Sequence, residues 1–185
     1  MLLRPDKDSQ PWEGLQGTDS FFPYRVGNRW LGFYGSANTE HKPIEHWRVG
    51  LVEAAQLAGP WKRYAGTNPV KEFSDFNVGK SFAENPIVTR LEDGGYMTMF
   101  DNEYPNGIGY SWSPDGLHWM WGKNLVLQPK GASFWADRIR TPLGLVAEGN
   151  SLFTLFYTGY QNVLGSDELR FEAIGFVTLK LQPQN

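Results

Sequence analysis

The feature that most constrains the fold of this chain is a strand–turn–strand pattern that occurs three times. The three copies are DSFFPYRVGNRWLGFYGS from Asp19, ENPIVTRLEDGGYMTMFD from Glu84 and RTPLGLVAEGNSLFTLFYTG from Arg140. Each has a polar residue, a short apolar strand, a turn with Gly or Asn, and an aromatic-rich strand. The copies begin 65 and 56 residues apart. Repetition at such a period, in units of about four strands, is typical of a β-propeller.

Further strands complete each repeat. A third strand follows in HWRVGLVEA, GIGYSWS and EAIGFVTLKL, and fourth strands are expected in GPWKRYAG and KNLVLQPKG. The third unit reaches LQPQN soon after its third strand. The one helix candidate, residues 52–59, stops at Gly59-Pro60 and is interpreted as a strand end plus a turn. We therefore predict an all-β chain with about three blades of four antiparallel strands, over residues 13–75, 78–130 and 135–182. A β-sandwich or barrel is the alternative.

The N-terminal stretch MLLRPDKDSQPW resembles LVLQPKGASFW, residues 125–135, which leads from a fourth strand into the next blade. Residues 1–12 are therefore expected to form an outermost strand that completes a last blade, within a single domain of residues 1–185. Natural proteins pair or cover exposed strand edges. Either the chain is a piece of a longer propeller, or two chains form a homodimer with twofold symmetry and about six blades, in which each N-terminal strand completes the partner's last blade.

Composition excludes several function classes. The chain has 17 basic and 20 acidic side chains and no run of Lys and Arg, so a nucleic-acid partner is not expected. The absence of cysteine removes disulfides, thiolate metal sites and thiol nucleophiles. The three histidines, His41, His46 and His118, lack metal-ligand spacing, and no cofactor-binding motif occurs, so we expect neither metal nor cofactor.

The chain shows no targeting or membrane segment. No window approaches about 18 consecutive apolar residues, so no membrane span is expected. Only two leucines precede Arg4 and Pro5, which is too few for a secretory signal, and a cytoplasmic location is therefore expected.

Several motifs together resemble the five-bladed β-propeller glycosidases, which include the arabinanase/β-xylosidase and invertase/levansucrase groups. The motifs are GGYMTMFDN, GNSLFTLFYTG, GNRWLGFYGS, LAGPW and IGYSWSPDGLHW. The resemblance extends from about residue 19 to residue 181 and covers about three blades. It implies a glycoside hydrolase-like propeller that acts on or binds a carbohydrate ligand. It also implies three acidic residues at the inner ends of successive blades: a base or nucleophile, an Asp that tunes the pKa, and a Glu that acts as general acid.

The resemblance carries these roles to particular residues. Glu84-Asn85-Pro86 has the Glu-x-Pro form of the general acid, with Asn85 where a small residue is more usual. Asp19 occupies the equivalent place in the preceding blade, with Ser20 where the family often has Pro. The third unit has Arg140-Thr141-Pro142 and no carboxylate there, so Asp137, three residues upstream, is the third catalytic candidate.

The chemistry explains why such residues are needed. Cleavage of a glycosidic bond requires one carboxylic acid to protonate the leaving oxygen and a second carboxylate to act as base or nucleophile. The acid must keep its proton near neutral pH, which a neighbouring carboxylate or an apolar wall achieves by raising its pKa. Trp12 and Trp135 lie in matching loops and could stack on a sugar ring, and an Arg at the mouth could hold a sugar hydroxyl. The candidates for substrate binding are Arg140, Trp12, Trp135, Asp101 and Tyr157.

Each candidate also has a purely structural interpretation. Glu84 could be a loop residue that accepts backbone hydrogen bonds, Asp19 an ordinary turn residue, and Asp137 with Arg140 an ion pair across a loop. SPDGLHW, residues 113–119, resembles a shortened Asp box, which is structural where it is used. For the whole chain, a non-catalytic sugar-binding or scaffold propeller is the main alternative. A protein-binding propeller with apolar patches on its rim is a third.

Overall fold

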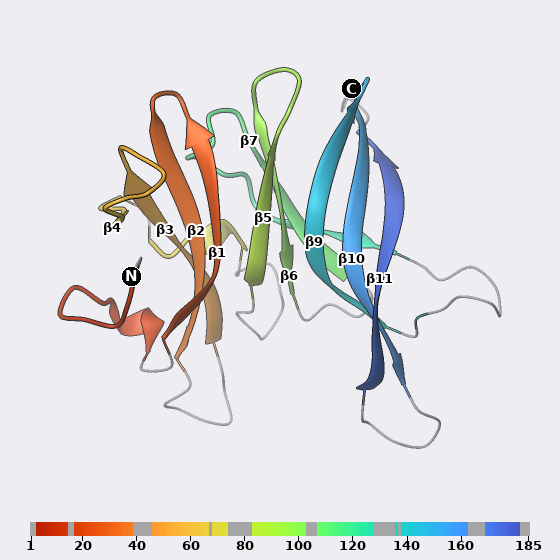
Figure 1. Cartoon of the computed structure of the whole chain (residues 1–185), viewed down its shortest axis with the longest axis horizontal. Helices are drawn as coiled ribbons and strands as arrows, with labels where there is room; N and C mark the ends of the chain where they lie inside the picture. Colours follow the sequence, from red (N-terminus) through yellow and green to blue (C-terminus); the bar gives the residue numbers. More distant parts are fainter. Residues whose placement is uncertain are drawn as a thin grey trace.

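Three antiparallel sheets, each continuous in sequence, stand side by side (Figure 1). The computed structural model describes residues 3–14, 17–38, 46–66, 68–73, 83–102, 107–127, 136, 138–162 and 169–181. The first sheet contains β1 (Thr18–Val26), β2 (Arg29–Asn38), β3 (His46–Ala54) and β4 (Lys62–Arg63). The second contains β5 (Glu84–Arg90), β6 (Tyr96–Asp101), β7 (Gly107–Ser113) and β8 (Lys123–Val126). The third contains β9 (Arg138–Gly149), β10 (Leu152–Asn162) and β11 (Leu169–Lys180).

This topology confirms the predicted fold class. Within each sheet the strands pair in chain order, and every pair is antiparallel, as in propeller blades. The expected fourth strands are β4 and β8, and the third sheet has three strands in the described part of the chain. Residues 52–59 are a strand end, at Ala54, followed by a turn. The described helices are the short 3₁₀ turns η1 (Pro11–Glu13) and η2 (Lys71–Phe73), and no described helix is long and apolar enough to span a membrane.

The first strand of each sheet lies closest to the neighbouring sheet. β1 contacts β5, and β5 contacts β9, so the three sheets radiate from a line of innermost strands (Figure 1). This arrangement brings the starts of β1, β5 and β9 to one end of the molecule.

Two apolar clusters hold the three sheets together. The cluster between the first and second sheets is aromatic: Phe73 stacks on Phe100 with ring centroids 4.8 Å apart, and Trp119 packs against Phe33. The cluster between the second and third sheets includes Met99 and Leu155. Burying each such side chain contributes about 1.5–3 kcal/mol. These two interfaces fix the sheets relative to one another.

The SPDGLHW segment forms a tight turn at the edge of the second sheet. Asp115 accepts hydrogen bonds from the backbone N–H groups of Leu117 and His118, and Ser113 Oγ accepts one from Gly116. The turn leads into Trp119, which is buried between the first two sheets. These contacts match the structural role expected for this motif.

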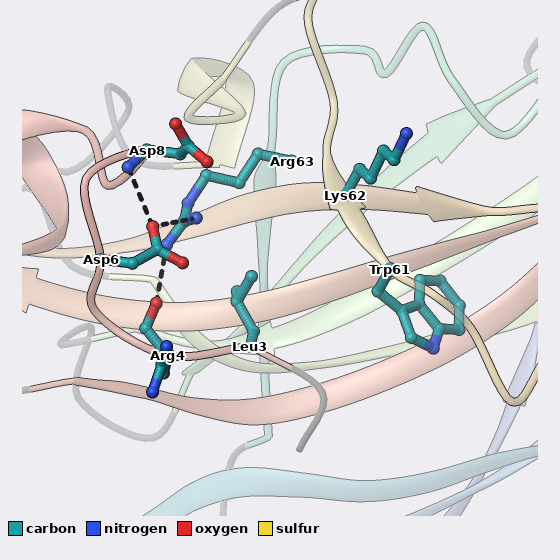
Figure 2. A pocket seen from close by; sticks show the side chains of 7 residues that line it. All are labelled: Leu3, Arg4, Asp6, Asp8, Trp61, Lys62 and Arg63. Atoms are coloured by element: carbon teal, nitrogen blue, oxygen red, sulfur yellow. Dashed lines mark hydrogen bonds and ion pairs between the residues drawn. The ribbon is translucent and has the colours of Figure 1, made fainter.

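The N-terminal segment packs on the outer face of the first sheet, away from the second. Arg63 in β4 donates to Glu13 at 2.7 Å. It also donates to Asp6 and to the Arg4 carbonyl, at 3.1 Å each (Figure 2). A cavity of about 720 Å³ lies beside Arg63. Residues 3–10 form no strand in this single chain, which differs from the strand expected over residues 1–12. Arg63 pairs with the carboxylates of Asp6 and Glu13 and hydrogen bonds to the Arg4 carbonyl, and these contacts hold the segment without strand pairing. Pairing of residues 1–12 with a second chain stays a prediction.

The outer face of the third sheet is, in contrast, apolar and exposed. Val146, Phe156, Ile174 and Phe176 lie on it, and Ile174 and Phe176 are 73% and 69% exposed. Monomer surfaces rarely gather large apolar side chains in this way.

Candidate functional site

The strands β1 and β5 carry the same irregularity at their starts. Asp19 pairs with Gly35 and Phe22 with Phe33, while Glu84 pairs with Asp101 and Ile87 with Met99. Between these pairs, two residues of β1 or β5 therefore lie opposite a single residue of the partner strand, which defines a β-bulge. Bulges re-aim side chains next to functional sites. Asp19 and Glu84 thus occupy equivalent positions in neighbouring sheets, as the sequence repeat predicted.

The residue after each acid stabilises the bulge. Ser20 and Asn85 adopt left-handed backbone conformations, with φ of 53° and 49°. Ser20 Oγ donates a 2.7 Å hydrogen bond to Asn85 Oδ1 and so links the two bulges. Asn tolerates this conformation better than most residues, which gives a physical reason for Asn85 in the position where a small residue was expected.

Glu84 stands at the start of β5, with its side chain 15% exposed. The pKa of its carboxyl is raised to about 7, first by burial and then by the negative charges of Asp101 and Asp19, while Arg140 acts in the opposite direction. A carboxyl with this pKa exchanges its proton near neutral pH.

Arg140 in β9 joins Glu84 to a second, deeper carboxylate. Its Nε donates to Asp101 Oδ2 at 2.9 Å, and its Nη2 lies 3.5 Å from Glu84 Oε2. Thr141 Oγ1 donates to the same Asp101 oxygen at 2.9 Å. The side chain of Asp101 is fully buried, and burial raises its pKa while Arg140 and Thr141 lower it. One guanidinium therefore contacts two carboxylates from the second sheet.

The third sheet has a bulge in the same place but with a different residue at the key position. Ile139 pairs with Gly159, and Pro142 pairs with Tyr157. By this register Ile139, and not Arg140, is equivalent to Asp19 and Glu84, which corrects the sequence alignment by one residue. Ile139 is buried in the cluster between the second and third sheets. The sequence alignment matched Pro142 to Pro86. The structural equivalence follows instead from the strand pairs on either side of each bulge.

Gly35 is a site residue that sequence reasoning missed. A Cβ on Gly35 would lie 2.5 Å from Asp19 Oδ1, so the carboxylate of Asp19 rests where a side chain would otherwise stand. Glycine in the middle of an aromatic-rich strand is the signal that could have indicated this close approach. Thr141 and Asn85, which contact Asp101 and Ser20, were also missed as side-chain partners.

The structure does not gather all the predicted residues. Tyr157 is buried in the cluster between the second and third sheets, and burial raises its pKa. Trp12 packs on Tyr34 with ring centroids 5.6 Å apart, on the outer side of the first sheet. Trp135 and Asp137 lie outside the described residues, so the expected pairing of Asp137 with Arg140 is not described. No group of three His, Asp or Glu side chains in the described part of the chain is placed to hold a metal ion.

The arrangement is suited to two functions, acid–base catalysis and sugar binding. The carboxyl of Glu84 is half-buried and has a near-neutral pKa, and the exposed carboxylate of Asp19 lies beside it on the next sheet. This pair is suited to acid–base catalysis on a polar ligand. The same acids and the Arg140 guanidinium also offer acceptors and donors for sugar hydroxyls.

Comparison with known proteins gives structural neighbours only. No family model matches the sequence, and no curated protein does. The GH62 α-L-arabinofuranosidase catalytic domain of Coprinopsis cinerea is similar, with a TM-score of 0.56 and 17% identity, over 85% of this chain and 46% of that one. The GH32 β-fructofuranosidase of Bombyx mori matches with a TM-score of 0.60 and 14% identity, over 89% and 34%. An α-L-arabinofuranosidase of Podospora anserina, solved with cellotriose, matches with a TM-score of 0.53 and 14% identity, over 85% and 46%.

These likenesses concern the fold, because the identities are low. The chain spans less than half the length of each of these three neighbours. With its three radial sheets and the line of innermost strands β1, β5 and β9, the chain has the fold of part of the five-bladed β-propeller glycosidases.

Proposed function

We propose that this chain is a glycoside hydrolase-like propeller protein in which Glu84 protonates the leaving oxygen of a glycosidic bond. The observation that carries the proposal is the position of Glu84 at the inner end of β5, largely buried and close to Asp101 and Asp19, which raises its pKa to about 7. A carboxylic acid with such a pKa still holds a proton at neutral pH and can give it to an oxygen with little cost. The names of the structural neighbours, which are arabinofuranosidases and a fructofuranosidase, support a glycan as ligand.

The other site residues would act around Glu84. Asp19 is exposed and comes from the adjacent sheet, so it is the second carboxylate that acts as base or nucleophile. Asp101 is too deeply buried to meet a ligand, and we assign it the tuning role in place of substrate contact. Its negative charge favours the protonated form of Glu84, while Arg140 holds both carboxylates in position.

The test compares turnover of aryl glycosides of arabinofuranose, xylose and fructose by the wild type and Glu84→Gln. We expect turnover by the wild type and a loss of at least about a hundredfold in the variant, in line with removal of a general acid. Glu148→Gln is the matched control, because Glu148 is exposed and accepts a hydrogen bond from Thr154 within the third sheet. Equal turnover by wild type and Glu84→Gln would contradict the catalytic role.

A second candidate function is non-catalytic sugar binding. It is favoured by Ile139, which stands where the first two sheets carry carboxylates, and by the contact of Arg140 with Glu84. In that case no glycoside is turned over, but an oligosaccharide binds, and Arg140→Ala weakens the binding. Aryl glycoside turnover that depends on Glu84 would exclude this candidate.

We also propose that the exposed apolar face of the third sheet is covered by a second copy of the chain. The face bears Val146, Phe156, Ile174 and Phe176, whereas the corresponding outer face of the first sheet is covered by the N-terminal segment. If the chain is a piece of a longer propeller, a further blade takes the same place. The oligomeric state separates these two arrangements.

A further inference from the structure

A second cavity lies between the second and third sheets, at the end opposite to Glu84. Its volume is about 830 Å³, and its walls come from the turn after β5, the end of β7, the segment before β8 and the start of β10. Glu84 begins β5 and Leu91 follows its last residue, so the length of a seven-residue strand, about 20 Å, separates the two places. Figure 1 shows the β5–β6 connection at the end of the sheet away from the start of β5. The cavity is therefore not part of the Glu84 site.

Two tryptophans that line this cavity are partly exposed and do not belong to the apolar core. Trp112 is 40% exposed and Trp121 is 52% exposed, with Met120, 56% exposed, beside them. Three other tryptophans pack on aromatic rings: Trp12 on Tyr34, Trp61 on Phe21, and Trp119 on Tyr24, Phe33 and Phe73. Trp112 and Trp121 belong to none of the three apolar clusters. Large apolar side chains that line a cavity are typical of a ligand-binding site.

The cavity wall also carries polar groups held in place by the backbone. Glu92 accepts hydrogen bonds from the N–H groups of Asn150 and Ser151, which ties the turn after β5 to the third sheet. Asp93 Oδ1 accepts one from Gly95, and its Oδ2 accepts none from the residues that the structure describes. Lys123 stands on the same wall and is exposed. A carboxylate and an ammonium group therefore belong to residues that line the same cavity as the two indole rings.

This combination fits a sugar better than an apolar or nucleic-acid ligand. A sugar ring has an apolar C–H face that packs on an indole, and hydroxyl groups at its edge that donate to a carboxylate and accept from an ammonium. A purely apolar ligand would leave Asp93 and Lys123 desolvated without partners, which costs free energy. Carboxylates from Glu92 and Asp93 would repel a phosphate backbone.

We propose that the Trp112–Trp121 cavity is a second glycan-binding site, which holds a polysaccharide chain at a distance from the Glu84 site. Its ligand class rests on the proposed function, but its residues do not overlap with those of the Glu84 site. Trp121, the more exposed of the two rings, provides the main stacking surface, and Asp93 and Lys123 orient the hydroxyls.

Affinity gel electrophoresis with soluble arabinoxylan, arabinan, hydroxyethylcellulose and inulin tests the proposal. We expect at least one polysaccharide to retard the wild type, and Trp121→Ala to weaken that binding about tenfold, as the loss of one aromatic stacking surface implies. Trp121→Tyr should recover part of it. Met120→Ala is the matched control, because it changes an exposed apolar neighbour in the same cavity without removing a ring. Thermal unfolding of each variant verifies that the fold is retained.

The Glu84→Gln variant separates this proposal from the proposed function. It should bind polysaccharide like the wild type, and Trp121→Ala should turn over small aryl glycosides like the wild type. Failure of all four polysaccharides to retard the wild type would overturn the second site, as would retardation that Trp121→Ala leaves unchanged. A change in sedimentation mass in Trp121→Ala would also overturn it, because the cavity would then be an interface between copies.

Discussion

Ser20 and Asn85, which are 65 residues apart in the sequence, join the first two sheets through a 2.7 Å hydrogen bond between Ser20 Oγ and Asn85 Oδ1. Each residue follows an acid at a β-bulge, and each has a positive φ. The bond therefore couples the positions of Asp19 and Glu84. The geometry of the candidate site depends on two residues that carry no charge.

Substitution of Asn85 should reveal this coupling as a loss of stability. Asn85→Val removes the acceptor and forces a β-branched residue into a left-handed conformation, for a combined cost of about 2–3 kcal/mol. Asn85→Gly loses only the hydrogen bond and should cost about 1 kcal/mol, since glycine accepts positive φ. Urea unfolding measures both free energies. Equal losses in the two variants would show that backbone strain is not involved.

The raised pKa of Glu84 predicts a pH dependence of stability. In the unfolded chain a Glu ionises near its ordinary pKa, whereas in the folded chain Glu84 ionises at about 7. Between these values the folded state binds more protons, so the free energy of unfolding falls as pH rises from about 4.5 to 7. The shift corresponds to at most about 3 kcal/mol.

Glu84→Gln provides the control for that dependence, because glutamine does not titrate. The stability of the variant relative to the wild type should increase across the same pH interval. Denaturant unfolding at pH 4.5, 6 and 8 measures the difference. A constant difference between the two proteins would mean that the carboxyl of Glu84 titrates at its ordinary pKa.

Gly35 predicts a specific loss of activity without unfolding. In Gly35→Ala the new methyl group would lie 2.5 Å from Asp19 Oδ1, so the carboxylate has to move away. If Asp19 is the base or nucleophile, turnover falls by about tenfold or more, because a misplacement of about 1 Å costs about a hundredfold. Gly144→Ala is the matched control, since a Cβ at Gly144 meets nothing within 4 Å. Unchanged turnover in Gly35→Ala would remove Asp19 from the mechanism.

The fold and the equivalent positions of Asp19 and Glu84 followed from sequence patterns, whereas the contacts of Glu84 with other strands did not. Alternating apolar residues and Gly or Asn turns predict strand order, because the pattern and the turns are local. The pairing of Glu84 with Asp101 joins two strands across a bulge, and a bulge changes register without leaving a unique sequence signal. For the same reason the third unit was aligned on Arg140, one residue away from the structural equivalent Ile139.

The buried role of Asp101 was hidden for a related reason. In the sequence it is simply an acid after an apolar strand, and that position is common for a solvated turn residue. Only the packing of β9 against β5 and β6 brings Arg140 and Thr141 to it. Contacts between sheets depend on the tertiary fold, so local patterns could not assign this carboxylate.

Arg140 and Asp101 should show strong energetic coupling. Arg140→Gln leaves the buried carboxylate of Asp101 without its cation and should cost about 2–3 kcal/mol, somewhat less than a fully buried pair because Arg140 is 38% exposed. Asp101→Asn in the same background removes that charge and should restore part of the stability. A double-mutant cycle by urea unfolding gives the coupling energy. Additive effects of the two substitutions would show that the ion pair contributes no net stability.

The exposed face of the third sheet predicts concentration-dependent association. Sedimentation equilibrium of the wild type should give a dimer at micromolar concentration, since Ile174 and Phe176 expose an apolar surface that water disfavours. Ile174→Asp places a charge on that face, in the edge strand β11, and should shift the mass to that of a monomer, with glycoside turnover retained if the Glu84 site lies within one chain. Lys62→Asp, on the edge strand of the first sheet, is the control and should leave the mass unchanged. If the wild type stays monomeric at all concentrations, the dimer is contradicted. A further blade of the same polypeptide is then the remaining candidate to cover this apolar face.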